Sequence, residues 1–72
     1  MKKMTLKDSV IWVIHNMAIG QRFHGNELRD LVAVHYPRAE RAYVDTVLRV
    51  ARRYCRGMYK VVDRTKSLYE RI

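Results

Sequence analysis

Residues 44–62 read VDTVLRVARRYCRGMYKVV, and the spacing of their apolar side chains changes at Gly57. Before Gly57 the apolar positions follow a period of 3.6 residues, which predicts an amphipathic helix over about residues 43–56. We expect its inward stripe to consist of Val44, Val47, Leu48, Ala51 and Cys55. After Gly57 the period is 2, as in a β-strand with one buried face. A helix and a strand therefore meet at this glycine.

The polar stretch DRTK at residues 63–66 separates this strand from a second alternating segment, so we expect a β-hairpin over residues 58–72. Pairing of Val62 with Ser67 would place on the inner face Tyr59, Val61, Leu68 and Ile72. The outer face would then carry Lys60, Tyr69 and Arg71. A slip of one residue would reverse this assignment, because side chains alternate along a strand.

Two further helices are predicted before residue 43. The first spans residues 6–19, between a Thr5 cap and a stop at Gly20, with a core stripe of Leu6, Val10, Ile11, Val13, Ile14, Met17 and Ala18. The second spans residues 25–35 and ends before Pro37; its predicted core face is Leu28, Leu31 and Val32. Glu27 can reach back to the amide at the start of this helix, and Phe23 is expected to point inward from a short extended segment.

The composition describes one basic domain over residues 1–72, in which residues 1–4 are expected to be a flexible N-terminus. The chain has 15 Lys and Arg against 7 Asp and Glu, giving a formal charge of +8. Residues 36–72 hold 10 basic and 4 acidic side chains, a surplus of +6, against +2 in residues 1–35. Such a surface favours nucleic acid or an anionic membrane surface, although a charge of +8 alone could equally serve solubility. A chain this short also excludes a multi-domain enzyme.

Several other classes of protein are disfavoured. The single Cys55 cannot form an internal disulfide, and the longest apolar run, residues 10–14, is too short to cross a bilayer, so we expect a cytoplasmic protein without a membrane contact. No glycine-rich phosphate loop, nucleophile elbow or paired carboxylate motif is present. His15, His24, His35 and Cys55 show no metal-ligand spacing. We therefore expect no enzymatic activity, no metal and no cofactor.

The predicted order of elements is helix, short extended segment, helix, helix and hairpin, which resembles the winged helix-turn-helix domain. The resemblance covers residues 5–72 and lies in residues 23–28 (FHGNEL), 45–49 (DTVLR) and 66–69 (KSLY). It is closest in kind to the small stand-alone versions of bacteria and phages. The fold class is then α+β, mainly α, with three helices followed by a hairpin wing. The segment between the second and third helices is longer than in compact members, so the third helix could start anywhere from residue 38 to 44.

The resemblance implies that the third helix enters the major groove of double-stranded DNA, as expected of a small transcriptional regulator. Base contacts fall on Tyr43, Thr46 and Arg49, and phosphate contacts on Arg41, Arg52, Arg53 and Arg56. The wing carries Arg64 and Lys66. Three competing interpretations stay open: an ion pair between Asp45 and Arg49, a junction-filling role for Tyr43, and a merely solvated hairpin turn.

Trp12 and Ile19 project from the side of the first helix that is opposite to its core stripe. They are candidates for a protein contact, either self-association as a homodimer or a different partner, although Trp12 could instead pack on the hairpin or under residues 1–4. The alternative function is accordingly a protein-interaction module, an adaptor or a phage-type inhibitor, that binds its partner through the Trp12 face or the basic face.

Overall fold

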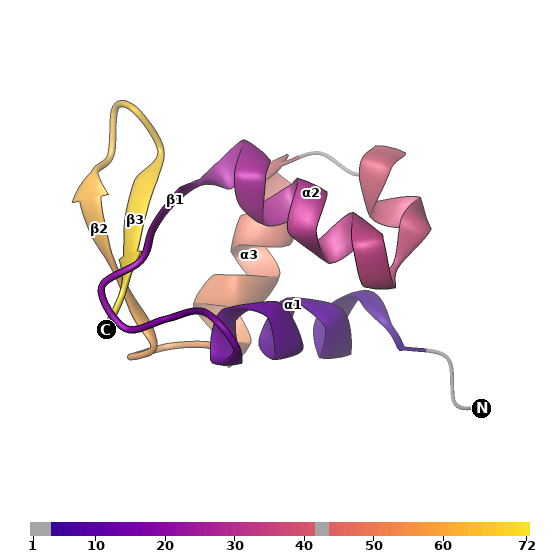
Figure 1. Ribbon diagram of the computed structural model, residues 1–72. Helices are drawn as coiled ribbons and strands as arrows, with labels where there is room; N and C mark the ends of the chain where they lie inside the picture. The colour runs from indigo at the N-terminus through magenta and orange to yellow at the C-terminus, as the bar shows by residue number, and fades with distance from the viewer. Residues whose placement is uncertain (1–3, 42–43) are drawn as a thin grey trace.

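The computed structural model describes residues 4–41 and 44–72, and it has an α+β fold that is mainly helical (Figure 1). In chain order the elements are α1 (Leu6–His15), β1 (Arg22–His24), α2 (Gly25–His35), the 3-10 helix η1 (Pro37–Arg41), α3 (Val44–Tyr54), β2 (Tyr59–Asp63) and β3 (Leu68–Arg71). Tyr43 and residues 1–3 of the expected flexible N-terminus lie outside the described residues.

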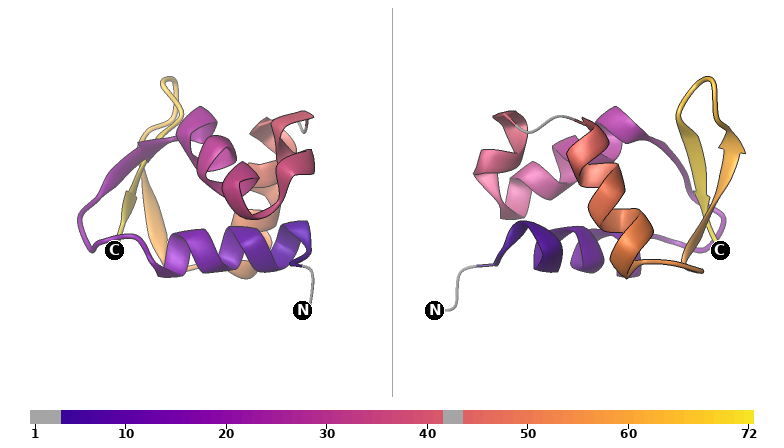
Figure 2. Two further views of the ribbon diagram at one scale, coloured as in Figure 1. Left: turned by 45° about the vertical axis from the view of Figure 1, so that its right-hand side comes forward. Right: turned by 180° about the vertical axis from the view of Figure 1, so that it is seen from behind.

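The three α-helices pack against one another, and the sheet lies at the end of this layer where α1 ends and α2 begins (Figure 1). α3 lies behind α1 and α2 in Figure 1 and in front of them in the reverse view of Figure 2. One broad side of the molecule is therefore formed by α3, and the opposite side by α1 and α2.

The sheet is antiparallel and has the strand order β1-β3-β2. The expectation of helices followed by a two-stranded hairpin was incomplete, because the extended segment around Phe23 adds a third strand to the far side of β3. A three-residue strand has too few side chains to reveal a periodicity, and its partner lies more than 40 residues away in sequence. The sequence therefore indicated the extended conformation but not the pairing.

The predicted hairpin register was wrong by one residue. Tyr59 pairs with Arg71 and Val61 with Tyr69, and a bulge between Val61 and Asp63 then brings Asp63 opposite Leu68. Tyr69 and Arg71 consequently share the inner face with Tyr59, whereas Leu68 alternates to the other face and Ile72 is exposed. The aromatic rings explain this register, because Tyr69 stacks on the buried ring of Phe23 at a centroid distance of 5.6 Å.

α1 ends at His15, four residues before its predicted end. The side-chain amide of Asn16 donates a hydrogen bond of 2.8 Å to the carbonyl of Trp12 and so caps the last turn. Ala18, expected in the core stripe, is exposed in the turn that leads to β1. In this turn Gly20 has a φ of 89°, a conformation that glycine adopts without steric cost.

α2 has the predicted bounds, and Glu27 Oε1 accepts a hydrogen bond from the backbone N–H of His24 at 3.1 Å, as the capping pattern predicted. Leu31 was wrongly placed in the core, because it lies at the edge of the α1–α2 contact and is half exposed. α3 has the predicted buried stripe of Val47, Leu48, Ala51 and Cys55, with Val44 half buried.

Arg71 joins the sheet to α1. Its Nε donates to the carbonyl of Ile14 at 2.9 Å, and its Nη1 donates to the carbonyls of Met58 and Ile72. The last carbonyls of a helix lack intrahelical partners and carry the negative end of the helix dipole, so a guanidinium there is favourable. This arginine is structural, and its charge is not available to a partner.

Candidate nucleic-acid interface

The outer side of α3 is strongly basic. Its inward stripe is fully apolar, and the remaining positions of the helix and the turn after it expose Asp45, Thr46, Arg49, Arg52, Arg53 and Arg56. These are the positions that the sequence placed outward, so the amphipathic interpretation of this helix is confirmed. Guanidinium groups on one face of a helix can bind phosphate or guanine through paired N–H donors.

No ion pair joins an arginine of α3 to a carboxylate among the side chains that the structure describes, which do not include that of Glu40. The ion pairs found there are Arg22–Glu70 at 3.1 Å, Lys60–Glu70 at 3.3 Å and Arg29–Asp30 at 3.8 Å. The competing interpretation of Arg49, an ion pair with Asp45 one turn away, is therefore not realised. Arg49, Arg52 and Arg53 are exposed, and none of the ion pairs between described side chains involves them.

The sheet, by contrast, neutralises much of its own charge. Glu70 on β3 lies between Arg22 of β1 and Lys60 of β2, and these hydrogen-bonded partners, Arg22 first, lower the pKa of its carboxyl group. The outer face of the sheet thus carries a partly compensated cluster of two cations and one carboxylate. The available basic charge of the described chain is concentrated on α3, η1 and the β2–β3 turn.

The start of α2, the start of α3 and the β2–β3 turn come close together at Gly25, the first residue of α2. A Cβ atom at this position would lie 2.7 Å from Val44 Cγ1 and 2.9 Å from Ser67 Oγ. Val44 is the first residue of α3, and Ser67 is the last residue of the β2–β3 turn. The absence of a side chain at Gly25 therefore lets the start of α3 and the base of the turn approach each other.

The β2–β3 turn is held in one shape by Asp63. Its Oδ1 accepts hydrogen bonds from the hydroxyl of Thr65 at 2.6 Å, the amide of Thr65 at 3.0 Å and the amide of Lys66 at 3.3 Å. The Thr65 hydroxyl is the main reason why the pKa of Asp63 is lowered. Arg64 and Lys66, the predicted basic pair, are both exposed on this turn.

The turn is also fastened to α2. The amide of Gly25 donates to the carbonyl of Ser67 at 3.1 Å, and Nδ1 of His24 lies 3.0 Å from the carbonyl oxygen of Lys66. The sequence favoured His24 as a helix cap, and it does occupy the residue before α2. Its ring, however, contacts the β2–β3 turn. This contact joins residues that are far apart in sequence, so it could not be predicted from the local pattern.

A hollow of about 330 Å³ lies between the end of α3 and the start of β2. It is lined by Arg52, Arg56, Gly57 and Tyr59. Burial, reinforced by the neighbouring Tyr69 and opposed by Arg52, raises the pKa of Tyr59, so its hydroxyl remains a neutral hydrogen-bond donor. Two guanidinium groups and a phenol around one hollow suit the oxygens of a phosphate group. The sequence had assigned Tyr59 a purely structural role.

Arg53 is exposed on α3 and contacts the ring of the next residue, Tyr54. Its Cζ is 5.6 Å from the centroid of the Tyr54 ring, and Nζ of Lys7 is 4.8 Å from the same ring. These are cation–π distances, so the half-exposed Tyr54 holds a cation from each of two helices. Tyr54 was not among the predicted functional residues, because it adjoins the core stripe in sequence.

η1 contributes two exposed arginines, Arg38 and Arg41, of which the sequence had singled out Arg41. Residues 37–41 of the long connection between the second and third helices thus form a 3-10 helix, in which Ala39 is fully buried. Tyr43, the remaining predicted base contact, lies outside the described residues.

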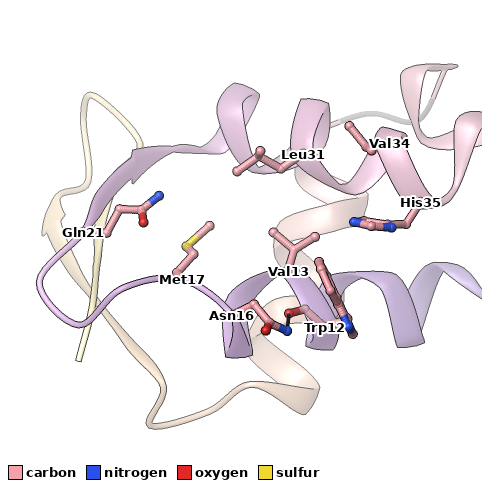
Figure 3. A pocket seen from close by; sticks show the side chains of 8 residues that line it. All are labelled: Trp12, Val13, Asn16, Met17, Gln21, Leu31, Val34 and His35. Carbon is pink, nitrogen blue, oxygen red and sulfur yellow. Dashed lines mark hydrogen bonds between the residues drawn. The ribbon is translucent and has the colours of Figure 1, made fainter.

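The face formed by α1 and α2 is apolar. Trp12 is 46% exposed and lies tilted against the ring of His35, with a centroid distance of 4.4 Å. A hollow of about 300 Å³ beside it is lined by Trp12, Val13, Asn16, Met17, Gln21, Leu31, Val34 and His35 (Figure 3). Ile19 is 78% exposed but lies in the turn after α1 and does not line this hollow. The structure therefore separates the two residues that the sequence had grouped.

The described residues contain no group of three His, Cys, Asp or Glu side chains that could hold a metal ion. Cys55 is buried, and burial raises the pKa of its thiol, an effect that Arg71 partly opposes. None of the helices in residues 4–41 and 44–72 has both the length and the apolar character required to span a bilayer.

Comparison of the chain with protein-family models, with curated proteins and with solved structures finds no match. A functional assignment for this chain therefore depends on its own residues and geometry.

Proposed function

We propose that this chain is a winged helix-turn-helix domain that binds double-stranded DNA in a sequence-specific manner and acts as a small transcriptional regulator. The observation that carries the proposal is the exposed arginine face of α3. The order α1-β1-α2-α3-β2-β3 and the basic turn beside the start of α3 support the same assignment.

In the proposed complex α3 lies in the major groove, which at about 12 Å is wide enough for a helix. Thr46 and Arg49 belong to the first half of α3 and are exposed, so they are the base-reading candidates, together with Tyr43. Arg49 can donate two hydrogen bonds to O6 and N7 of guanine, which discriminates against other bases by about 1–3 kcal/mol.

The remaining basic residues position the duplex through its phosphates. Arg52 and Arg56 offer the hollow beside Tyr59 to one phosphate, and the exposed Arg41 and Arg53 are candidates for contacts with other phosphates. Arg64 and Lys66 serve as the wing, because the hydrogen bonds of Asp63 hold their turn in a fixed shape before DNA arrives. Contacts of this kind set affinity and register without reading sequence.

The test is a fluorescence-anisotropy titration against random duplex DNA and against selected sites, between about 50 and 200 mM salt. The parent protein should bind duplex with a steep negative dependence of log K on log salt concentration. Arg49→Ala should reduce the preference for the selected site by about tenfold or more, whereas Arg53→Ala should weaken all sequences alike and lower the salt slope by about one.

Arg22→Ala is the matched control, since it removes one positive charge from the partly compensated cluster on the sheet and should leave binding nearly unchanged. Identical behaviour of all three variants would refute the division of roles. Absence of duplex binding at the lowest salt would refute the DNA proposal itself. Saturable binding of an acidic protein to α3 would then favour the interaction module.

A further inference from the structure

The outer side of α1 is an apolar surface that the proposed DNA contact does not use. A second hollow of about 300 Å³ lies on this side and is lined by Met4, Asp8, Ile11, Trp12, His15 and Asn16. Trp12 and Asn16 also line the hollow between α1 and α2. The indole therefore stands between two hollows, beside the exposed Val34 and Leu31 of α2.

This surface differs from the rest of the molecule in charge. Eight residues line the first hollow and six the second, with two shared, and none of these twelve is Lys or Arg. The chain as a whole has 15 Lys and Arg among 72 residues. The helices that carry this surface, α1 and α2, lie on the side of the molecule opposite α3 (Figures 1 and 2). A polyanion has nothing to bind there, whereas a second copy of this basic chain can approach it without repulsion.

We propose that two copies of the chain associate through the outer faces of α1, packed antiparallel about a two-fold axis between Ile11 and Trp12. The residues along this face are Asp8, Ile11, Trp12 and His15, which follow the helical spacing i, i+3, i+4 and i+7. Asp8 and His15 lie at equal distances from the axis, about 5 Å along the helix in opposite directions. An antiparallel pairing therefore brings Asp8 of each copy opposite His15 of the other.

This pairing is chemically complementary, because the carboxylate of Asp8 accepts a hydrogen bond that the imidazole of His15 can donate. Trp12 is the central anchor: its contact with His35 already fixes the indole, so little side-chain freedom is lost on association. A self-complementary surface of this kind is what an isologous dimer requires. A different partner would not need the acid and the imidazole to be symmetric about a point between Ile11 and Trp12.

The test is the oligomeric state of the full chain without DNA, so that its outcome is independent of the proposed function. Sedimentation equilibrium from about 1 μM to 1 mM should show a monomer–dimer equilibrium. Trp12 is the single tryptophan of the chain, and its emission should shift to shorter wavelength as the dimer forms. A monomer at every concentration would overturn the proposal and leave the surface to a different protein.

Charge exchange tests the geometry. His15→Asp places two carboxylates opposite each other at both ends of the helix pair and should weaken the dimer about tenfold or more. The double variant Asp8→His with His15→Asp re-creates the pair in reverse and should recover most of the affinity. A failure of the double variant to recover would overturn the antiparallel register.

Substitution of two partly exposed valines tests where the dimer interface lies. Val34→Glu, on the apolar surface, should weaken the dimer, and Val61→Glu, at the sheet, should not. Val34 is 73% exposed and Val61 48% exposed, and neither belongs to the buried core. A dimer that is sensitive to Val61→Glu and insensitive to Val34→Glu would place the interface elsewhere and refute the proposal.

Discussion

Replacing Gly25 with alanine should destabilise the whole interface although it alters no basic residue. The added methyl group would lie 2.7 Å from Val44 Cγ1 and 2.9 Å from Ser67 Oγ, well inside normal contact distances. Either the start of α3 or the base of the β2–β3 turn must move. Because Val44 is branched at Cβ and follows the backbone of α3, the side chain cannot simply turn away.

The expected cost follows from these distances. Inserting a methyl group into a packed site costs about 1–3 kcal/mol, and the better helix propensity of alanine returns at most about 1 kcal/mol. A net loss of about 1–2 kcal/mol lowers the melting temperature of a domain this small by about 5–15 °C. Binding of duplex DNA should weaken as well, since the turn and α3 are displaced relative to each other.

Thermal unfolding of Gly25→Ala, of Val44→Ala and of the double variant would measure the contact directly. Val44→Ala removes the atom that crowds the new methyl group, so the double variant should be more stable than additivity predicts by about 1 kcal/mol. Gly20→Ala is the control, because its cost comes from a φ of 89° with nothing within 4 Å, and it should be additive with Val44→Ala. An unchanged melting temperature for Gly25→Ala, or strict additivity with Val44→Ala, would refute the reasoning.

Two further predictions concern stability. Arg71→Met keeps the length of the side chain but removes the donors to the carbonyls of Ile14 and Met58, and should lower the free energy of unfolding by about 1–3 kcal/mol in urea titrations; a value near zero would contradict the structural role of Arg71. Because the pKa of Asp63 is lowered in the folded state, its contribution is present at neutral pH and is lost as the pH falls below about 4. Asp63→Asn should therefore flatten the acid limb of the stability curve, and an acid limb like that of the parent would contradict this.

Much of the helical structure was predictable because its signals are local. The bounds of α2 follow from Glu27 and Pro37, and the buried stripe of α3 follows from its period of 3.6 residues. The exposed arginines of α3 were found in the same way, since a residue opposite a strong apolar stripe must face solvent. These predictions needed no knowledge of the other elements.

The predictions that were wrong concern features that depend mostly on contacts between segments far apart in sequence. The hairpin register was set by the ring of Phe23 against Tyr69 and by a bulge, and neither is visible in the alternation of β2 and β3. The sequence placed Arg71 on the outer face of the hairpin, but its guanidinium donates a hydrogen bond to the carbonyl of Ile14 in α1. The end of α1 was misplaced because apolar residues continue to Ile19, while the Asn16 side chain caps the helix earlier.

Part of the candidate site also depended on the tertiary fold. The hollow beside Tyr59 joins the end of α3 to β2, and the contact of His24 with Lys66 joins α2 to the β2–β3 turn. A sequence pattern identifies which residues are basic and which are exposed. It does not show which of them form ion pairs, as Arg22 and Lys60 do with the carboxylate of Glu70.

The position of β1 in the chain has a consequence for the order of folding. Arg22 and its partner Glu70 are 48 residues apart, and α2, η1 and α3 must all be placed before the two can meet. Closing so long a loop is entropically unfavourable until the helices have packed, so we expect strand pairing to be the late, rate-limiting step. During synthesis, the ring of Phe23 stays uncovered until residues 68–71 have left the ribosome. Among the described strands, β3 is synthesised after β1 and β2, and it is the strand that pairs with β1.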